Sequence, residues 1–206
     1  MSRNGSADRV IRAAARWQAA RPGGRGLLVV AIDGHGAAGK STIAGAVARA
    51  TGAALVHTDD FFRSPPAPDG GRALRGYYDW RRLRARALEP LRAHRATTFR
   101  RFDWDRGHGL DGTVAVQPSD LVLVEGVFSA APELSDLVDR SVFVHTPEPE
   151  RLRRLRRRVA PEEWDADWLT AEHAYFDLIR PPSSFDLVVT GTGRPAPAGR
   201  TAVTST

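Results

Sequence analysis

The clearest chemical signature in the sequence is a glycine-rich segment that contains the chain's single lysine. Residues 34–41 read Gly-His-Gly-Ala-Ala-Gly-Lys-Ser, which matches the pattern G-x-x-x-x-G-K-[ST] of a phosphate-binding loop (P-loop). Of the 30 lysine and arginine residues, all except Lys40 are arginines. A compact ammonium group therefore stands where a P-loop lysine reaches the β- and γ-phosphates of a nucleotide.

The other residues of the segment fit the same role. Glycines allow the backbone to approach phosphates closely, and the Ser41 hydroxyl is placed to ligate Mg²⁺. The alternative is a glycine-rich turn that merely caps a helix. The candidate nucleotide-binding residues are Gly34, Gly36, Ala37, Ala38, Gly39, Lys40, Ser41 and Thr42.

Acidic residues follow two further apolar runs. Asp59 and Asp60 come after the run at 54–58, and Glu125 comes directly after the run at 120–124. In an open parallel sheet, reactive groups gather at the carboxyl ends of the strands, so these acids are expected to face the phosphates and their metal. Each also has an ordinary interpretation, as a helix N-cap or as the partner of an arginine.

The surrounding pattern predicts the elements that position these groups. Strands are expected at 27–32, 54–58, 120–124, 141–145 and 186–189, and helices at 6–20, 41–50, 79–95, 147–158 and 162–179. Segments 97–104 and 113–117 are expected to pair as a hairpin at the edge of the sheet. This order predicts an α/β fold, a P-loop NTPase three-layer sandwich with a five-stranded parallel sheet, an edge β-hairpin and a helical lid.

Length and composition limit the class of protein. The 206 residues suit one domain, divided into an N-terminal helical extension (1–26), a P-loop kinase domain (27–192) and a flexible tail (193–206). The chain has no cysteine and no apolar run near the roughly 20 residues of a membrane span. We therefore expect a soluble, cytoplasmic protein without a membrane partner.

The net charge of +6 raises the question of nucleic-acid binding. Arginines cluster at 3–25, 81–101 and 151–158, and the last segment has six arginines and no acid. Clustered arginine suits a triphosphate as well as a polynucleotide backbone, and the sequence has no nucleic-acid recognition motif. In a helix, Arg151, Arg154 and Arg158 fall on one side, which favours phosphate contact over a merely solvated face.

The sequence resembles the uridine kinase and phosphoribulokinase group of P-loop small-molecule kinases, which includes the nicotinamide riboside kinases. The matching segments are 34–42, Asp-Asp-Phe-Phe at 59–62, Tyr78-Asp79, Phe102-Asp103, Val-Glu-Gly at 124–126, 151–158 and 185–189. Where uridine kinases have a segment of the type Asn-Pro-Asp-x-Phe-Asp, this chain has Arg-Gly-Tyr-Tyr-Asp-Trp at 75–80. The resemblance therefore indicates the family more firmly than pyrimidine specificity.

The resemblance also implies roles for particular residues. It makes Asp59 the base for the acceptor hydroxyl, Glu125 a Mg²⁺ ligand, and Arg154 and Arg158 the lid arginines over the phosphates. Ser41 of the P-loop and Asp60, beside the base, are the further candidate metal residues. The resemblance assigns ribose binding to Asp79, beside Tyr78, and further acceptor contacts to Phe102, Asp103 and His108. Residues 78–80 also have a structural interpretation, in which the rings of Tyr78 and Trp80 pack against the start of a helix and Asp79 caps that helix.

The expected activity is an ATP- and Mg²⁺-dependent transfer of the γ-phosphate to a hydroxyl of a nucleoside or other ribose-bearing small molecule. Two other classes remain open from the sequence. A P-loop regulatory NTPase would hydrolyse ATP slowly without an acceptor, and a nucleic-acid-binding protein would show steep salt dependence.

Overall fold

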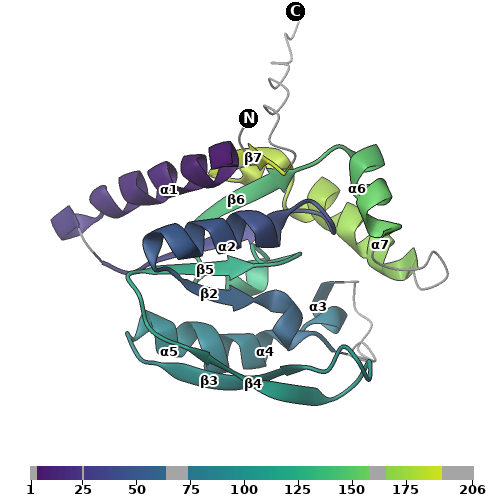
Figure 1. Cartoon of the computed structure of the whole chain (residues 1–206), viewed down its shortest axis with the longest axis horizontal. Coiled ribbons are helices and arrows are strands. Elements are labelled where there is room, and N and C mark those ends of the chain that lie inside the picture. Colours follow the sequence, from purple (N-terminus) through teal and green to yellow (C-terminus); the bar gives the residue numbers. More distant parts are fainter. Residues whose placement is uncertain (1–3, 25, 64–73, 158–165, 192–206) are drawn as a thin grey trace, which may run out of the picture.

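The computed structural model describes residues 4–24, 26–63, 74–157 and 166–191, and these form a parallel sheet with helices on both faces (Figure 1). The spatial strand order is β2-β5-β1-β6-β7, and every pairing is parallel. The strands are β1 (Leu28–Asp33), β2 (Ala54–His57), β5 (Leu121–Glu125), β6 (Arg140–His145) and β7 (Leu187–Thr190). The five predicted strands are confirmed.

The central strand β1 is buried along its whole length, as the continuous apolar run predicts. Successive side chains of a strand point to opposite faces, and they divide between two cores. Leu28, Val30 and Ile32 belong to one apolar cluster, whereas Val29 and Ala31 belong to the other. The fold therefore has three layers, with the sheet in the middle.

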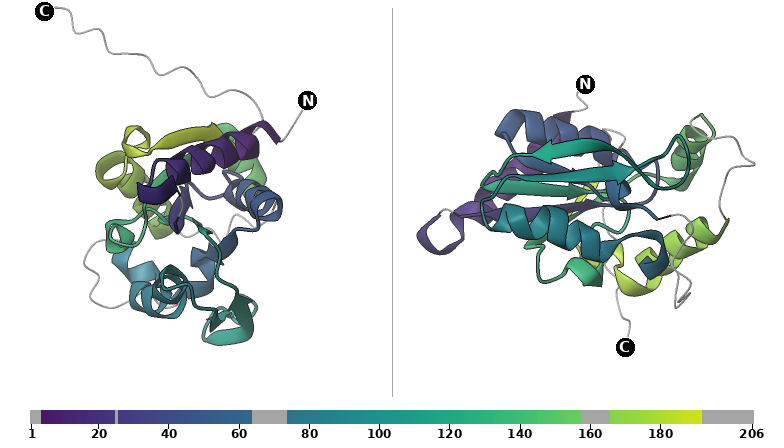
Figure 2. Two further views of the ribbon diagram at one scale, coloured as in Figure 1. Left: turned by 90° about the vertical axis from the view of Figure 1, so that its left-hand side faces the viewer. Right: turned by 90° about the horizontal axis from the view of Figure 1, so that it is seen from below.

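The first face is covered by α1 (Asn4–Ala19) and α2 (Lys40–Thr51), which lie side by side (Figure 2). Ala7, Val10 and Ala14 of α1 share one apolar cluster with Ile43 and Val47 of α2. The amphipathic N-terminal helix predicted at 6–20 is thus confirmed, and it forms part of the core.

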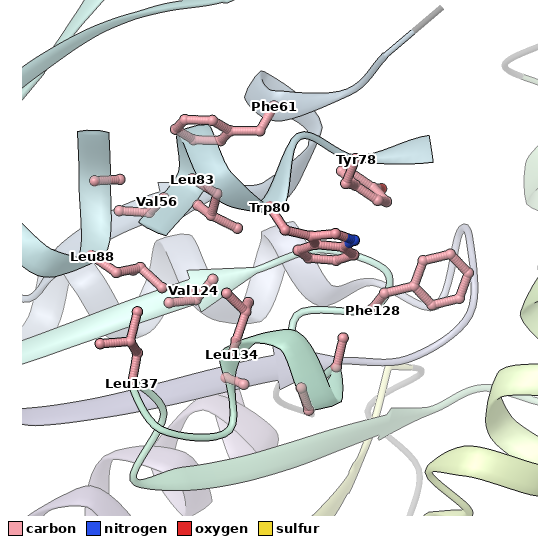
Figure 3. Packing of buried hydrophobic residues seen from close by; sticks show 14 of the residues in the cluster. Val56, Phe61, Tyr78, Trp80, Leu83, Leu88, Val124, Phe128, Leu134 and Leu137 are labelled. Carbon is pink, nitrogen blue, oxygen red and sulfur yellow. The ribbon is translucent and has the colours of Figure 1, made fainter. Parts of the chain in front are cut away.

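The opposite face is covered by a helical segment made of α4 (Trp80–Leu83), a π-helical turn η3 (Arg84–Leu88) and α5 (Glu89–Arg92). Its Leu83 and Leu88 pack with Val56 and Val124 of the sheet (Figure 3). Each such buried aliphatic side chain contributes about 1.5–3 kcal/mol. The predicted helix at 79–95 is confirmed, apart from the π-helical turn in its middle.

The predicted hairpin is confirmed as an antiparallel pair, β3 (Thr97–Phe102) with β4 (Leu110–Val116). It forms a two-stranded sheet of its own, and β4 contacts β2, the edge strand of the main sheet. The second strand begins three residues earlier than the sequence indicates, with Leu110 opposite Phe102.

The helical lid consists of α6 (Glu148–Leu155) and of α7 (Ala166–Ala174), which continues into the π-helical η6 (Tyr175–Ile179). The remaining short elements are η1 (Pro22–Gly24), η2 (Thr58–Phe61), α3 (Leu74–Tyr77), η4 (Pro132–Leu134) and η7 (Pro182–Ser184). The predicted tail at 193–206 lies outside the described residues. Within the described ranges, no helix is long and apolar enough to cross a membrane.

Candidate active site

The P-loop joins the carboxyl end of β1 to the first turn of α2, as the sequence predicts. Gly34 has a φ of +143°, and a Cβ there would lie 2.6 Å from the Val144 carbonyl oxygen, so the close approach of β6 requires glycine. Gly39, at the N-cap of α2, has no side chain to bond the first helical N–H groups. These groups and the helix dipole favour an anion at this position.

Lys40 is buried and folds back across the loop. Its Nζ donates hydrogen bonds to the carbonyl oxygens of Gly34 (2.8 Å) and His35 (2.9 Å). The ammonium group is therefore held at the end of the loop that faces the sheet, and it lines a cavity of about 590 Å³.

Glu125, the last residue of β5, links two neighbouring elements. In the sheet it pairs in register with Ile32 of β1 and His57 of β2. Ser41 Oγ donates to Glu125 Oε1 at 3.0 Å, and His57 Nδ1 lies 2.7 Å from Glu125 Oε2. The hydrogen bond from His57 and the charge of Lys40 hold the pKa of Glu125 below its usual value despite burial, and the same carboxylate raises the pKa of His57.

The glycine of the Val-Glu-Gly segment has a packing role. Gly126 has a φ of +149°, and a Cβ on it would fall 1.7 Å from Thr58 Oγ1. Only glycine lets the chain leave β5 so close to the residue that follows β2. This contact fixes the distance between Glu125 and the acids after β2.

Asp59 opens into the same cavity as Lys40, Ser41 and Glu125. Its Oδ1 accepts a hydrogen bond of 3.1 Å from the hydroxyl of Tyr78, which is buried. Although the side chain is open to the cavity, the surrounding protein raises the pKa of Asp59 by desolvation, and the negative charge of Glu125 adds to this effect. A carboxyl group with a raised pKa is suited to accept a proton near neutral pH.

Asp60 lies beside this site and not in the lining of the cavity. Its backbone oxygen accepts from Arg82 Nη2 at 2.9 Å. Partial burial raises the pKa of its side chain, while the nearby charge of His57 lowers it. Of the two adjacent aspartates, only Asp59 faces the P-loop lysine across the cavity.

Aromatic and apolar side chains form the cavity wall opposite the P-loop. Trp104, which follows β3, is 55% exposed, and its ring centroid lies 4.9 Å from that of Phe62. Trp168 of α7 lies 6.0 Å from Phe62 and 6.1 Å from Tyr78. The cavity lining is completed by Val127, Leu155, Leu169 and Glu172.

The lid contacts the P-loop through arginines of α6. Arg154 donates to the carbonyl oxygens of Ala37 (3.2 Å), Ala38 (3.5 Å) and Gly191 (3.3 Å), while its Nε pairs with Glu150. The predicted lid arginine thus touches the phosphate loop from outside the cavity lining. Arg158 lies outside the described residues.

Two acidic residues that sequence analysis missed hold the P-loop in place. Asp33 is fully buried, and its oxygens accept from the backbone N–H groups of Gly34, Phe128 and Ala130 and from the Tyr175 hydroxyl, at 2.7–2.9 Å. Burial raises its pKa to about 6, against the lowering effect of these donors. The end of β1, the loop after β5 and the lid thus meet at one carboxyl group.

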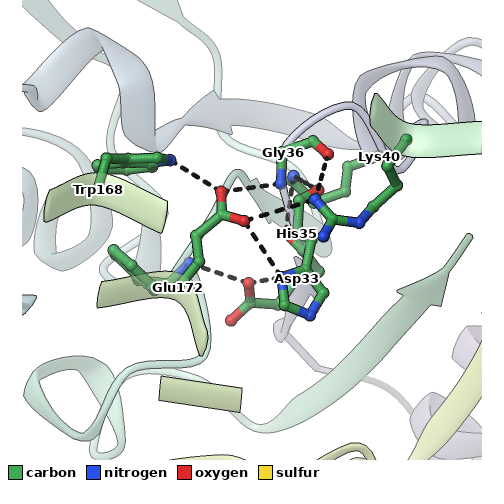
Figure 4. Close-up of polar contacts among 9 residues, drawn as sticks. Asp33, His35, Gly36, Lys40, Trp168 and Glu172 are labelled. Carbon is green, nitrogen blue, oxygen red and sulfur yellow. Dashed lines mark hydrogen bonds and ion pairs between the residues drawn. The ribbon is translucent and has the colours of Figure 1, made fainter. Parts of the chain in front are cut away.

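Glu172 of α7 is the second missed residue, and it contacts the P-loop directly (Figure 4). Its Oε1 accepts from the Gly36 N–H at 2.9 Å, and its Oε2 lies 3.1 Å from His35 Nδ1. No local pattern marks it, since the partners are 136 and 137 positions away.

Apart from Tyr78, the residues predicted to contact the acceptor lie outside the cavity lining. Asp79 Oδ1 accepts from the Arg82 N–H at 3.0 Å and caps α4, which matches the structural interpretation of 78–80. Asp103 accepts from the N–H groups of Asp105 and Arg106 in the hairpin turn, next to buried Phe102. His108 is exposed and contacts the Arg106 carbonyl oxygen. Tyr78 alone of this set lines the cavity.

The donor set suits a magnesium ion that also binds phosphates. Among the described residues, no group of three or more His, Asp or Glu side chains is placed to hold a metal by itself. Ser41 Oγ and the Glu125 carboxylate lie together beside the P-loop, and Mg²⁺ in nucleotide sites is held by one or two protein oxygens plus substrate phosphates. The residues therefore fit Mg²⁺ bound together with a nucleotide.

Comparison with known proteins supports this picture, although no protein-family model matches the sequence. A uridine kinase of Halobacterium salinarum is 27% identical over 162 residues, covering 74% of this chain and 71% of its own length. A uridine kinase of Limosilactobacillus reuteri is 28% identical over 111 residues, about half of each chain.

Solved structures show the same fold. A possible uridine kinase from Bacillus stearothermophilus superposes with a TM-score of 0.65 at 22% identity, covering 91% of this chain and 99% of its own. A putative fructose transport system kinase from Silicibacter sp. TM1040 gives 0.59 at 21% identity, with coverage of 92% and 99%. The predicted P-loop fold is confirmed, and the sequence comparisons support the predicted resemblance to uridine kinase-like small-molecule kinases.

Proposed function

We propose that the protein is an ATP- and Mg²⁺-dependent kinase that phosphorylates a hydroxyl group of a nucleoside or another ribose-bearing small molecule. The observation that carries this proposal is that Asp59 opens into the same cavity as Lys40 and the Ser41–Glu125 pair. Phosphoryl transfer requires positioning in line and neutralisation of charge, and these groups suit both tasks.

The donor side of the reaction is assigned to the P-loop. Backbone N–H groups of residues 34–42 and the N-terminus of α2 bind the ATP phosphates, and Lys40 neutralises charge on the transferred group. Ser41 and Glu125 would hold Mg²⁺, with Asp60 as an additional candidate near them, and the ion would supply positive charge to offset that of the phosphates. Arg154 and Arg158 are the proposed lid arginines.

The acceptor side is assigned to Asp59. Its carboxylate accepts the proton of the acceptor hydroxyl as that oxygen bonds to the γ-phosphorus and the bond to the ADP oxygen breaks. The Tyr78 hydroxyl holds the Asp59 side chain by its hydrogen bond to Oδ1. The raised pKa of Asp59 makes it a better proton acceptor at neutral pH than an ordinary aspartate.

The aromatic wall supports an acceptor with a flat ring or a sugar face. Phe62, Trp104 and Trp168 present apolar surface beside the carboxylate, and such surfaces bind nucleobases and sugar rings. The curated relatives named above are uridine kinases. Asp79, Phe102, Asp103 and His108 remain acceptor contacts predicted from the sequence.

The test is a panel of acceptors scored by stimulated ADP release. It includes uridine, cytidine, adenosine and a pyridine nucleoside. Fructose and glycerate are added because solved structures of the same fold include the putative fructose transport system kinase and a D-glycerate 3-kinase from Cryptococcus neoformans. The latter superposes with a TM-score of 0.51 at 16% identity, covering 75% of this chain and 78% of its own. We expect a ribonucleoside to give the highest kcat/KM. Slow ADP release that no acceptor stimulates would instead indicate a regulatory NTPase.

A further inference from the structure

A single oxygen atom connects the P-loop to the opposite wall of the cavity. Glu172 Oε1 accepts from the backbone N–H of Gly36 at 2.9 Å and from Trp168 Nε1 at 2.8 Å. Gly36 and Trp168 both line the cavity. Figure 4 shows the carboxylate between these two donors.

The second oxygen of Glu172 holds the carboxylate in this position. Oε2 lies 3.1 Å from His35 Nδ1 and 3.7 Å from Arg151 Nη1, and both Glu172 and Arg151 are buried. Burial raises the pKa of Glu172, but the hydrogen bond from His35 and the charge of Lys40 outweigh it and hold this pKa below its usual value. The group is therefore a fixed, charged acceptor, and hydrogen bonds to charged acceptors are the stronger ones.

Trp168 in turn packs near Tyr78, the residue that hydrogen-bonds Asp59. Its ring lies 6.1 Å from that of Tyr78 and 5.3 Å from that of Phe128. Tyr78 donates to Asp59 Oδ1. A displacement of Trp168 therefore changes the packing around the hydroxyl that orients Asp59.

We propose that Glu172 is a positioning residue that couples nucleotide binding at the P-loop to the placement of Trp168 and thereby to the acceptor side of the cavity. The proposal rests on the proposed function for the identity of the two ligands. Nucleotide binding changes the surroundings of the Gly36 N–H, and the shared oxygen transmits this change to the indole N–H.

The direct test is NMR of the tryptophan indole N–H groups in the full chain, which needs no acceptor. Trp168→Phe identifies the Trp168 resonance among those of the five tryptophans. Magnesium with a non-hydrolysable ATP analogue is titrated in, and calorimetry measures its Kd separately. We expect the Trp168 resonance to shift in the unmodified protein. We expect the shift to be lost in Glu172→Ala and reduced in Glu172→Gln, whose amide oxygen can still accept a hydrogen bond.

The matched control is Glu148→Gln, the same change at an exposed position on α6, which should leave the shift intact. A Trp168 resonance that moves equally in Glu172→Ala, or that does not move when calorimetry shows the analogue bound, overturns the proposal. Absence of any nucleotide binding would refute the proposed function itself, and the inference with it. Calorimetry distinguishes the two failures.

Kinetics give a second test that does not depend on the fold of a Glu172 variant. Trp168→Phe removes the indole donor and leaves the carboxylate and its other partners in place. We expect kcat/KM for the acceptor to fall about 10- to 100-fold, which is the loss of rate that a misplaced reacting group causes. The KM for ATP should change less than about threefold. Equal losses for both substrates, or no loss, would contradict the coupling.

Discussion

Ser41 Oγ donates a hydrogen bond to Glu125 Oε1 at 3.0 Å, and this bond joins the first turn of α2 to the last residue of β5. The two residues are 84 positions apart in the chain. They meet because β5 lies next to β1 in the sheet, so that the strand ending in Glu125 runs beside the strand that feeds the P-loop. On the other side of β5, its pairing with β2 brings His57 and Asp59 of the β2 end to this edge.

Lys40→Arg tests whether the single lysine has a role that the chain's many arginines cannot fill. The guanidinium group is planar and larger than the ammonium group, and Lys40 is buried against two carbonyl oxygens of its own loop. We expect turnover to fall by about 10²-fold or more in Lys40→Arg and in Lys40→Ala, with the fold intact by circular dichroism. Near-normal turnover of Lys40→Arg would contradict the assignment.

Asp59→Asn and Asp60→Asn form a matched pair that separates the base from its neighbour. Only Asp59 opens into the cavity, so Asp59→Asn should reduce acceptor phosphorylation by about 10²- to 10⁴-fold, the usual worth of a general base, with the ATP Kd nearly unchanged. Asp60→Asn should have a smaller effect, partly restored by more Mg²⁺. Equal loss in both, or a larger loss in Asp60→Asn, would reverse the roles.

The nucleotide side of the site could be predicted from the sequence because its signals are local. The motif at 34–41 and the apolar runs that precede Asp59 and Glu125 identify three strand ends, and the structure brings these together in one cavity. The βα order also predicts the parallel sheet, because parallel strands need crossover connections.

The contacts that α7 and Asp33 make with the P-loop could not be predicted, because they depend on tertiary packing. Glu172 and Trp168 lie on a helix whose sequence gives no sign of which face meets the P-loop, and Asp33 reads as one polar residue at the end of an apolar run. Asp79 and Asp103 match family segments, yet both satisfy backbone N–H groups of their own turns. Short-range capping and long-range recognition call for the same residue types.

His57→Gln tests the pH dependence of the pair with Glu125, measured as the free energy of unfolding in urea without nucleotide. The folded pKa of His57 is raised from 6.5, so its stabilisation is present below pH 6.5 and is lost as pH rises through the raised value. The folded pKa of Glu125 is lowered from 4.5, so its stabilisation is lost as pH falls through the lowered value. The difference between the two proteins should be largest between about pH 4.5 and 6.5.

The size of this difference should be modest. The His57 side chain is 43% exposed, so solvent screens the pair, and we expect about 1 kcal/mol or less. His94→Gln, at an exposed histidine 4.0 Å from exposed Asp120, is the control. A stability difference that is flat from pH 4 to 9 would show that the His57–Glu125 pair does not form in solution.

Asp79→Ala and Asp79→Ser distinguish the capping role from ribose binding. Serine and aspartate are both good N-caps, whereas alanine is not. We expect Asp79→Ala to cost about 0.5–2 kcal/mol of stability and Asp79→Ser to restore most of it. If instead both variants keep their stability and lose the preference for a ribonucleoside over its 2′-deoxy form, Asp79 binds the ribose hydroxyls.

Tyr175→Phe tests the buried junction at Asp33. The hydroxyl of Tyr175 donates a hydrogen bond of 2.8 Å to Asp33 Oδ2, and both residues are fully buried. Removing this donor leaves a buried carboxyl group with one partner fewer, which costs about 1–3 kcal/mol. Urea unfolding should show a lower midpoint with an unchanged slope, because the surface exposed on unfolding stays the same. The same change in an Asp33→Asn background should cost less, since the charged acceptor is already gone. An unchanged midpoint for Tyr175→Phe, or equal costs in the two backgrounds, would show that the lid is not anchored to the end of β1 through this hydrogen bond.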